Sequence, residues 1–150
     1  KKKIDIKLLI IGYGANKIKM KNFISQNKIS GNVKIINFKK NPYKYLKKSN
    51  LFILTSLYEG LPNVLLEAMA LKKFIISSNC PTGPGEILKN GKLGMLFKIR
   101  DKKDLSNKIL NFNNKIKTNN KITYHAYSSL SRFDYKSNCE EYFKTVEEFI

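Results

Sequence analysis

The sequence predicts an α/β fold in which helices cover both faces of an open parallel sheet. Short apolar segments alternate with helical segments from residue 6 to residue 112, without an internal repeat or a tandem hairpin signal. This alternation is typical of parallel strands joined by helical crossovers. Ligands of such sheets bind beyond the carboxyl ends of the strands. The loops that follow the predicted strands are therefore where we expect a site.

Five segments are predicted to be strands, because each is short, apolar and bounded by turn residues. They are residues 6–14, which end in the turn Gly12-x-Gly14, and residues 32–38, 50–56, 74–78 and 94–99. Helices are expected at residues 16–28, 41–49 and 62–71, from Asp101 or Asp104 to about 112, and at 122–131 and 135–149, with a helical turn at 86–89. Residues 113–121 are polar and are predicted to be a break between helices.

Length and composition predict one domain over residues 1–150 with an apolar core. The chain is 42% hydrophobic, has no run of 18 apolar residues and shows no secretory signal, so we expect a cytoplasmic protein. It begins Lys-Lys-Lys without Met, as expected for a piece of a longer chain. Cys80 and Cys139 are expected to be reduced, and a single histidine, His125, argues against a metal site.

The net charge of +18 invites a nucleic-acid or membrane interpretation. The excess comes from 27 Lys and only 2 Arg, together with 17 Asn and 18 Ile, a combination that A/T-rich codons favour. A nucleic-acid binder is expected to use Arg for bidentate contacts, and the lysines here are scattered. We therefore expect no nucleic-acid partner. Peripheral contact with an anionic membrane, at its inner face, is kept as a secondary property.

The segment "TSLYEGLPNVLLEAMA", residues 55–70, stands out because the chain has few carboxylates. Between residues 6 and 100 the acids are Glu59, Glu67 and Glu86 alone, and two of them lie here. A turn must separate the strand before it from the helix that follows. Gly60 is expected to supply a backbone conformation that other residues resist, and Pro62 fits the first helical position.

A helix that starts at Pro62 predicts an anion site. The backbone N–H groups of Asn63, Val64 and also Leu65 would point out of the helix start, where the donors and the helix dipole act together. A pyrophosphate suits such a site. Glu59 and Glu67 would flank the anion and accept hydrogen bonds from hydroxyl groups such as a ribose diol. The arrangement favours a nucleotide sugar, although either glutamate alone is explained as a partner of the helix dipole.

Several segments resemble one enzyme family. "EGLPNVLLEAMA" resembles the segment with two glutamates eight positions apart in the family 4 (group 1) retaining glycosyltransferases of the GT-B fold. Four further segments resemble the flanking motifs of that family, namely "LLIIGYG", "NVKIINF", "NPYKYLKKSNLFILTS" and "CPTGPGEILKNGKLGMLF". The resemblance covers about residues 6–112 and implies a Rossmann-like domain, one half of a GT-B fold.

The resemblance implies the C-terminal, donor-binding half of a transferase whose N-terminal acceptor domain precedes residue 1. It implies a UDP-sugar donor, no metal or other cofactor, and retaining transfer to a glycan or lipid-linked acceptor in bacterial surface-polysaccharide synthesis. In the family the residue that matches Glu59 contacts the donor sugar, as the catalytic residue, and the one that matches Glu67 holds the ribose. The other donor-binding residues that it implies are Gly12, Phe38, Lys39, Gly60, Leu61, Pro62, Asn63 and Val64.

Three departures from the family pattern keep other interpretations open. The Gly-x-Pro turn after "EAMA" is Lys72-Lys73-Phe74 here, and a position that is often basic is Gly85. The basic pair that neutralises the diphosphate would precede residue 1, and Lys17 or Lys19 is a candidate to compensate. The alternative is a truncated or non-catalytic nucleotide-sugar-binding module, and a charge-driven polyanion binder is the third interpretation.

Overall fold

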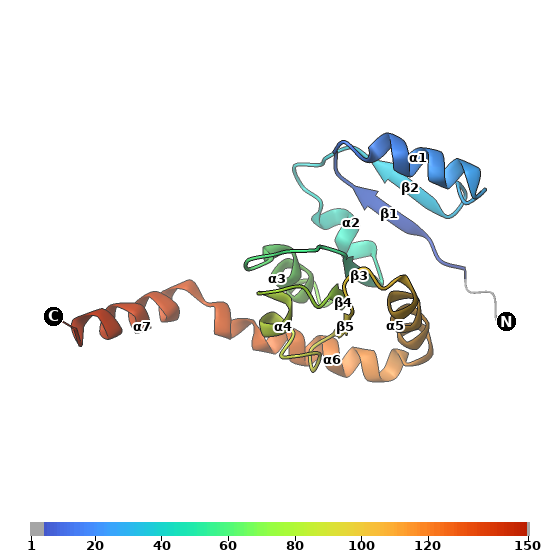
Figure 1. Ribbon diagram of the computed structural model, residues 1–150. Helices are drawn as coiled ribbons and strands as arrows, with labels where there is room; N and C mark the ends of the chain where they lie inside the picture. The colour runs from blue at the N-terminus through green and yellow to red at the C-terminus, as the bar shows by residue number, and fades with distance from the viewer. Residues whose placement is uncertain (1–4, 150) are drawn as a thin grey trace. The chain divides into compact units, whose positions relative to one another are not determined.

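The computed structural model describes residues 5–149, apart from the side chains of residues 116 and 117. The chain divides into two compact units, residues 1–44 and residues 45–150. Each unit contains parallel strands with helices beside them, which confirms the predicted α/β class (Figure 1). The paired strands form a two-stranded sheet in the first unit and a three-stranded sheet in the second.

The first unit is a single crossover of strand, helix and strand. β1 (Leu8–Ile11) and β2 (Val33–Ile36) pair in parallel, and α1 (Lys17–Gln26) connects them, as parallel pairing requires. β1 is shorter than the predicted segment because Gly12, with φ of +152°, leaves strand geometry. The Gly12 N–H still donates to the Ile36 carbonyl at 3.1 Å. The turn predicted from Gly12-x-Gly14 therefore begins where β1 ends.

The second unit is built around a parallel sheet with β4 in the centre. β3 (Leu51–Leu54) and β5 (Met95–Phe97) flank β4 (Phe74–Ser78). α2 (Tyr43–Lys48) precedes β3, and α3 (Asn63–Ala70) connects β3 to β4. α4 (Pro84–Ile87) lies between β4 and β5 in the chain, and α5 (Lys102–Asn114) follows β5. All five predicted strands are present, and each lies within its predicted segment; β4 spans the whole of its segment.

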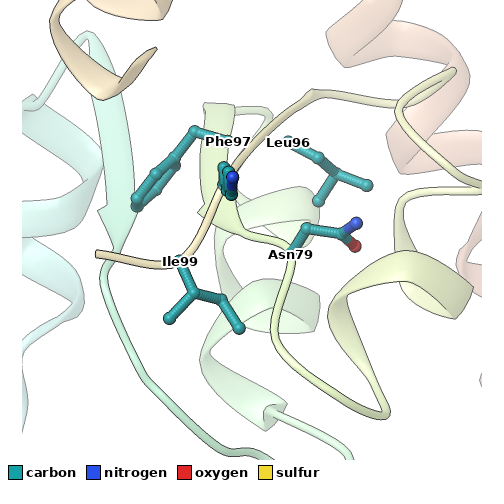
Figure 2. A pocket seen from close by; sticks show the side chains of 5 residues that line it. Asn79, Leu96, Phe97 and Ile99 are labelled. Carbon is teal, nitrogen blue, oxygen red and sulfur yellow. The ribbon is translucent and has the colours of Figure 1, made fainter. Parts of the chain in front are cut away.

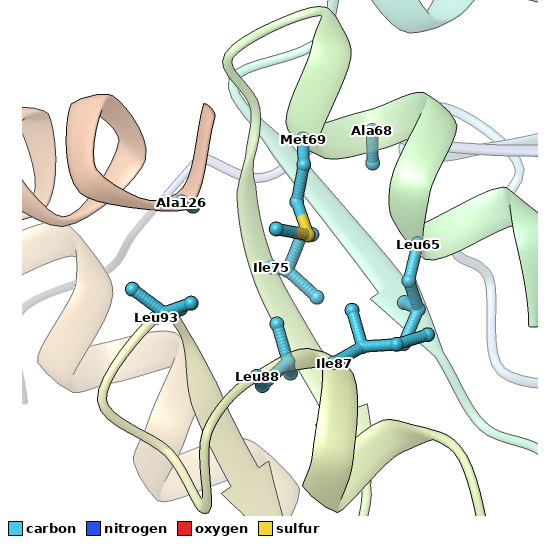
Figure 3. Close-up of a cluster of buried hydrophobic side chains, with 8 residues drawn as sticks. All are labelled: Leu65, Ala68, Met69, Ile75, Ile87, Leu88, Leu93 and Ala126. Carbon is cyan, nitrogen blue, oxygen red and sulfur yellow. The ribbon is translucent and has the colours of Figure 1, made fainter. Parts of the chain in front are cut away.

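The core lies on both faces of β4, whose five residues are all buried. Successive side chains of a strand point to opposite faces, so Ile75 joins one cluster while Phe74 and Ile76 join another. The first cluster gathers side chains from α3, α4 and the C-terminal helices around Ile75 (Figure 3). The second packs on α5, where the Phe74 and Phe112 rings lie 5.1 Å apart between centroids. Burial of each large side chain contributes about 1.5–3 kcal/mol, and helices thus cover both faces of this sheet.

The C-terminal helices differ from the prediction. α5 extends to Asn114 and α6 (Ile116–Ser128) starts two residues later, so the predicted break over 113–121 is wrong. Tertiary contacts explain the difference: Asn119, which is buried, donates from its side chain to the Phe112 carbonyl at 2.7 Å. This hydrogen bond satisfies a carbonyl that the end of α5 would otherwise leave open. Farther along α6, Ala126 is buried in the first cluster.

Arg132 connects the end of the chain to α4. It lies in η1 (Ser129–Phe133), a 3-10 segment that separates α6 from α7 (Tyr135–Glu147). Its guanidinium donates to the Ile87 carbonyl at 2.9 Å. A cation at the carbonyls that end a helix satisfies their open acceptors and complements the helix dipole. Arg132 therefore fixes the short α4, and with it the loop that precedes α4.

The last helix, α7, begins at a side-chain cap and is exposed along its length. Asp134 accepts a hydrogen bond from the Ser137 N–H at 3.0 Å. Hydrogen bonds from the Ser137 backbone and hydroxyl hold the pKa of Asp134 below its ordinary value. Large apolar side chains of α7 and of the residues after it are exposed, among them Tyr142, Phe143, Val146 and Phe149. No helix in the described part of the chain combines the length and apolar character that a membrane span requires.

Lys72 closes the turn between α3 and β4 in a conformation that usually takes glycine. Its φ is +53°, its N–H donates to the Met69 carbonyl at 2.9 Å, and the Lys73 N–H donates to the Ala68 carbonyl at 2.8 Å. These two bonds are those of a Schellman motif, in which the left-handed residue is usually Gly. The ammonium of Lys72 lies 4.6 Å from the centre of the Tyr127 ring. The turn therefore forms without the family's Gly and Pro, at the cost of one strained residue.

The variants Lys72→Gly and Lys72→Ala separate this strain from the contact with Tyr127. Both lose the ammonium, but only glycine relieves the positive φ, so we expect Lys72→Gly to be more stable than Lys72→Ala by about 1 kcal/mol. Denaturant unfolding of the two variants measures the difference in the free energy of unfolding. Equal stabilities would show that the side chain does not strain this turn.

Candidate functional site

The segment between β3 and α3 ends in an amide-bearing helix start. α3 begins at Asn63, and Pro62 is its N-cap with φ of −72° and ψ of 92°, so the prediction that Pro62 is the first helical residue is wrong by one position. The extended ψ explains the difference, because proline fixes only φ. The Leu65 N–H donates to the Pro62 carbonyl at 2.8 Å and is not free, contrary to expectation. Among the described residues, the N–H groups of Asn63 and Val64 have no hydrogen-bond partner.

Glu59 is held in place by hydroxyl groups from both neighbouring strands. The Ser56 hydroxyl donates to Glu59 Oε1 at 2.5 Å, and the Ser78 hydroxyl donates to the Ser56 carbonyl at 2.6 Å. The Thr82 hydroxyl donates to the backbone carbonyl of Glu59. Glu59 is half-buried, and its second carboxylate oxygen accepts no hydrogen bond from any residue that the structure describes. One oxygen is thus fixed and the other is available to a ligand.

The loop after β4 packs its backbone directly against this segment. A Cβ at Gly83 would lie 2.1 Å from the Gly60 carbonyl oxygen and 2.4 Å from Pro62 Cδ, so no side chain fits there. Gly83 has φ of +67°, and its neighbour Thr82 has φ of +59°. Left-handed backbone at a residue other than glycine costs about 1–3 kcal/mol and is common at functional sites. The strained residues of the site are therefore in this loop.

The role predicted for the backbone of Gly60 is wrong. Gly60 is not among the residues with positive φ, and a Cβ there would meet no atom within 4 Å. The residue that needs to be glycine at this contact is Gly83, which has a positive φ and no room for a Cβ. Open space at Gly60 means that its backbone can be approached closely from outside.

Glu67 lies in the second turn of α3, on the same side of the helix as Asn63. Residues four apart share a helix face, and at 1.5 Å per residue they are about 6 Å apart along the axis. The opposite face of α3 packs on the core through its buried residues Leu65, Ala68 and Met69. Glu67 is half-buried. Glu59 and Glu67 thus precede and follow the two amide groups along the chain.

The remaining predicted residues lie in the first unit, at the carboxyl ends of its strands. Gly12 follows β1, and a Cβ there would meet no atom within 4 Å. Phe38 and Lys39 follow β2, and both are exposed. The Phe38 ring meets the exposed Tyr13 ring edge-on, with centroids 6.2 Å apart.

Lys17 uses one of its donors within the first unit. Its Nζ donates to the side-chain oxygen of Asn37, which follows β2 in the same unit. An ammonium has three donors, and an amide oxygen does not neutralise its charge, so this contact leaves the compensating role of Lys17 a prediction. Lys19 is exposed on α1.

Sequence reasoning expected a site in the loops after the strands but assigned no role there to Ser56, Ser78, Thr82 or Gly83. The serines closed the predicted third and fourth strands, and their position at the carboxyl ends was the available signal. The residues Thr82-Gly83-Pro84-Gly85 follow the fourth predicted strand and are rich in turn formers, but the close approach at Gly83 depends on a partner 23 residues earlier. A single sequence does not show such a contact.

A hollow of about 350 Å³ opens at the carboxyl ends of β4 and β5. Asn79, which follows β4, lines it together with Leu96, Phe97, Lys98 and Ile99 (Figure 2). The Asn79 N–H donates to the Phe97 carbonyl at 2.8 Å and joins the two strand ends. Cys80 is buried and free, and no three Cys, His, Asp or Glu side chains within the described ranges form a metal-ligand set.

A parallel α/β fold with its polar loops at the carboxyl ends of the strands belongs to the Rossmann-like class of ligand-binding domains. Residues 1–129 match the family described as "Glycosyl transferases group 1". The chain belongs to this glycosyltransferase family, and the recognition made from the sequence is confirmed.

Three curated relatives show how much of such a protein this chain represents. An uncharacterized glycosyltransferase of Methanocaldococcus jannaschii is 45% identical over 84 residues, which are 56% of this chain and 21% of that protein. The N-acetylgalactosamine-N,N'-diacetylbacillosaminyl-diphospho-undecaprenol 4-alpha-N-acetylgalactosaminyltransferase of Campylobacter jejuni is 31% identical over 97 residues, 65% of this chain and 27% of that protein. The poly(ribitol-phosphate) alpha-N-acetylglucosaminyltransferase of Staphylococcus aureus is 30% identical over 110 residues, which are 73% of this chain and 22% of that protein. The chain thus spans between 21% and 27% of these relatives.

Solved structures confirm the fold class. TarM of S. aureus superposes with a TM-score of 0.84 and 25% identity over 92% of this chain and 28% of that chain. Anabaena HepE, solved in complex with UDP, gives a TM-score of 0.83 and 19% identity over 95% of this chain and 41% of that chain. The domain is therefore Rossmann-like, as in one half of a GT-B glycosyltransferase.

The variants Gly83→Ala and Gly85→Ala test the packing of the loop on the Glu59 segment. A Cβ at Gly83 collides with backbone and adopts an unfavourable φ, so we expect a loss of about 2–4 kcal/mol in the free energy of unfolding. A Cβ at Gly85 would approach only the side-chain oxygens of Asn90 and Asn79, at 3.3 and 3.7 Å. Gly85→Ala is expected to cost less than about 1 kcal/mol. Thermal or denaturant unfolding measures both, and similar losses would contradict the close approach.

Proposed function

We propose that this chain binds a UDP-sugar and is the donor-binding half of a retaining glycosyltransferase. The observation that carries the proposal is the pair of unpartnered N–H groups at Asn63 and Val64, beside a glutamate with one fixed and one open carboxylate oxygen. TarM, which shares the fold at 25% identity, has been solved with UDP and a GlcNAc derivative. The domain would cover residues 1–150, and an acceptor domain would precede it.

The diphosphate is proposed to bind at the start of α3. Donors and helix dipole there stabilise an anion by roughly 0.3–1 kcal/mol per charge, and by up to about 2 kcal/mol where the site is partly buried. The open space at Gly60 lets a phosphate or sugar approach the backbone of residues 60–64. In the transfer step the bond from the sugar to the diphosphate breaks, and negative charge grows on the departing oxygen. Fixed donors aimed at that charge lower the barrier.

The two glutamates are proposed to read different hydroxyl groups. Glu67 accepts hydrogen bonds from the ribose diol, and Glu59 accepts them from the donor sugar. Hydrogen bonds to a charged group are worth roughly 1.5–3 kcal/mol each. Ser56 and Thr82 keep Glu59 in position, so its open oxygen does not need to be ordered when the sugar binds.

The base is proposed to bind at the loop of the first unit that follows β2. Phe38 and Tyr13 present exposed rings there, and Gly12 leaves open space next to them in the chain. An exposed aromatic face stacks on a nucleobase, and Lys39 adds a cation. Gly12, Phe38 and Lys39 are thus proposed as the donor contacts that the first unit supplies.

The acceptor is proposed to be a glycan or a lipid-linked glycan of a bacterial surface polysaccharide. The relatives named above support this, since one acts on a diphospho-undecaprenol-linked sugar and another on poly(ribitol-phosphate). The alternative is a non-catalytic module that binds a nucleotide sugar. This alternative holds if the chain, joined to its acceptor domain, binds the donor but transfers no sugar.

The variants Glu59→Gln and Glu67→Gln test the division of roles by calorimetric titration with UDP and with a UDP-sugar. Glu67→Gln is expected to weaken both ligands at least tenfold, because both contain the ribose. Glu59→Gln is expected to weaken only the UDP-sugar, by about tenfold, and to leave UDP within about twofold. If the parent chain binds neither ligand at millimolar concentration, the donor proposal fails.

Gly60→Ala tests the backbone approach without disturbing the fold. A methyl group there meets no atom of the chain, so stability should change by less than about 0.5 kcal/mol. UDP-sugar affinity should fall more than about tenfold, because the methyl group keeps the ligand from the backbone. Gly31→Ala is the matched control, since Gly31 also has open space and lies before β2. Unchanged affinity in Gly60→Ala would remove residues 60–64 from the site.

A further inference from the structure

Positive charge is concentrated in the first unit of the chain. Residues 1–44 contain 12 Lys, no Arg and a single acid, Asp5, so their formal net charge is +11. Residues 45–150 contain 17 Lys or Arg and 10 acids, a net charge of +7 over more than twice the length. A codon bias alone would act on both units alike. Such asymmetry between parts of a chain is typical of proteins that bind a polyanion or a membrane surface.

The single acid of this unit lies away from the lysines of its helix. The Asp5 carboxylate is 3.7 Å from the Lys7 ammonium and accepts a hydrogen bond from the Asn32 side chain at 3.2 Å, just before β1 and β2 begin. Four lysines and no acid lie in α1 and in the turn after it, namely Lys17, Lys19, Lys21 and Lys28. Among the residues that the structure describes, none of these four forms an ion pair. The charge of α1 is therefore uncompensated.

Two large apolar side chains of α1 are exposed beside these lysines. Ile18 is 72% exposed and Phe23 is 60% exposed. Residues three or four apart share a helix face, so Ile18 lies on the same side of α1 as Lys21, and Phe23 on the same side as Lys19. Interfacial helices present such a combination to a bilayer, where the ammonium groups meet anionic headgroups and the apolar groups enter the boundary with the acyl chains.

An anionic bilayer fits this surface better than a nucleic acid does. Residues 1–44 contain no Arg, the residue that makes bidentate contacts to phosphate and guanine. Exposed side chains such as Ile18 and Phe23 gain little from a duplex, because its bases are stacked inside. At a bilayer the same side chains leave water, which is favourable in proportion to the apolar area that is buried.

We propose that the exposed surface of α1 docks on an anionic lipid bilayer. Lys19 and Lys21 contact the headgroup phosphates, while Ile18 and Phe23 enter the boundary with the acyl chains. The surface belongs to the first unit alone, and its binding is measured without nucleotide, so the proposal does not depend on the donor site.

The test is co-sedimentation of the whole chain with vesicles in the absence of UDP. Vesicles that contain phosphatidylglycerol should bind the chain, and vesicles of phosphatidylcholine alone should not. Lys19→Gln/Lys21→Gln is expected to weaken binding to the anionic vesicles at least about fivefold. Lys102→Gln/Lys103→Gln removes the same charge from the exposed start of α5, and is expected to weaken it less than about twofold. Equal losses in the two pairs would overturn the proposal, because net charge alone would then explain binding.

A fluorescent side chain tests whether α1 enters the bilayer. The chain has no Trp, so Phe23→Trp and Phe143→Trp each carry a single reporter, at positions that are 60% and 64% exposed. The emission of Phe23→Trp should move to shorter wavelength on anionic vesicles, while that of Phe143→Trp, on α7, should not. An unchanged emission of Phe23→Trp on vesicles that bind the chain would contradict insertion. If duplex DNA moves the emission of Phe23→Trp as the vesicles do, α1 is a polyanion-binding surface and the proposal is wrong.

Discussion

The complete burial of β4 is the constraint on which the rest of the second unit depends. Its alternate side chains hold two clusters on opposite faces, so α3 and α5 are both placed by one five-residue strand. The same strand ends in Ser78, whose hydroxyl binds the Ser56 carbonyl, and Ser56 in turn binds Glu59. The position of the glutamate is thus set by the core. Polar groups buried at the end of a strand are satisfied by this chain of hydrogen bonds.

The chain separates its charges by role. Three of the carboxylates between residues 6 and 104, those of Glu59, Asp101 and Asp104, accept hydrogen bonds from a hydroxyl group or from backbone N–H groups. Many of the lysines are exposed, and the described ion pairs Lys7–Asp5 and Lys108–Asp104 are both solvent-accessible. Pairs of this kind contribute about 0–1 kcal/mol. Burial of apolar surface, and not ion pairing, therefore provides the stability of this chain.

The strands and most helices could be predicted because the spacing of apolar residues and the positions of turn residues indicate them directly. All five strands, the start of α3 near Pro62 and the helices on both faces of β4 followed from local pattern. The division between α5 and α6 did not, because Asn119 satisfies the end of α5 from seven residues away. The left-handed conformation of Lys72 could not be predicted either, because lysine is not a residue type that usually has a positive φ.

The sequence predicted which segment contains the candidate site but not which contacts hold that segment in place. Glu59, Asn63 and Glu67 were found from spacing and from the scarcity of acids, and their roles as ligand contacts stay predictions. The hydroxyl groups of Ser78 and Thr82, which support the Glu59 segment, and the glycine that makes room for Gly60 come from a different strand end, that of β4. Contacts between segments more than 20 residues apart leave no local signal in one sequence. They are also what decides how rigid the site is.

The fit between Gly83 and the Gly60–Pro62 backbone has a consequence for engineering. Two loops that touch backbone to backbone have no side chains through which to adjust, so neither can be exchanged for a homologous loop by itself. A chimera designed to change donor preference would have to transplant residues 56–62 and residues 80–83 as one cassette. The two loops therefore form one structural unit, although they come from two separate segments of the chain.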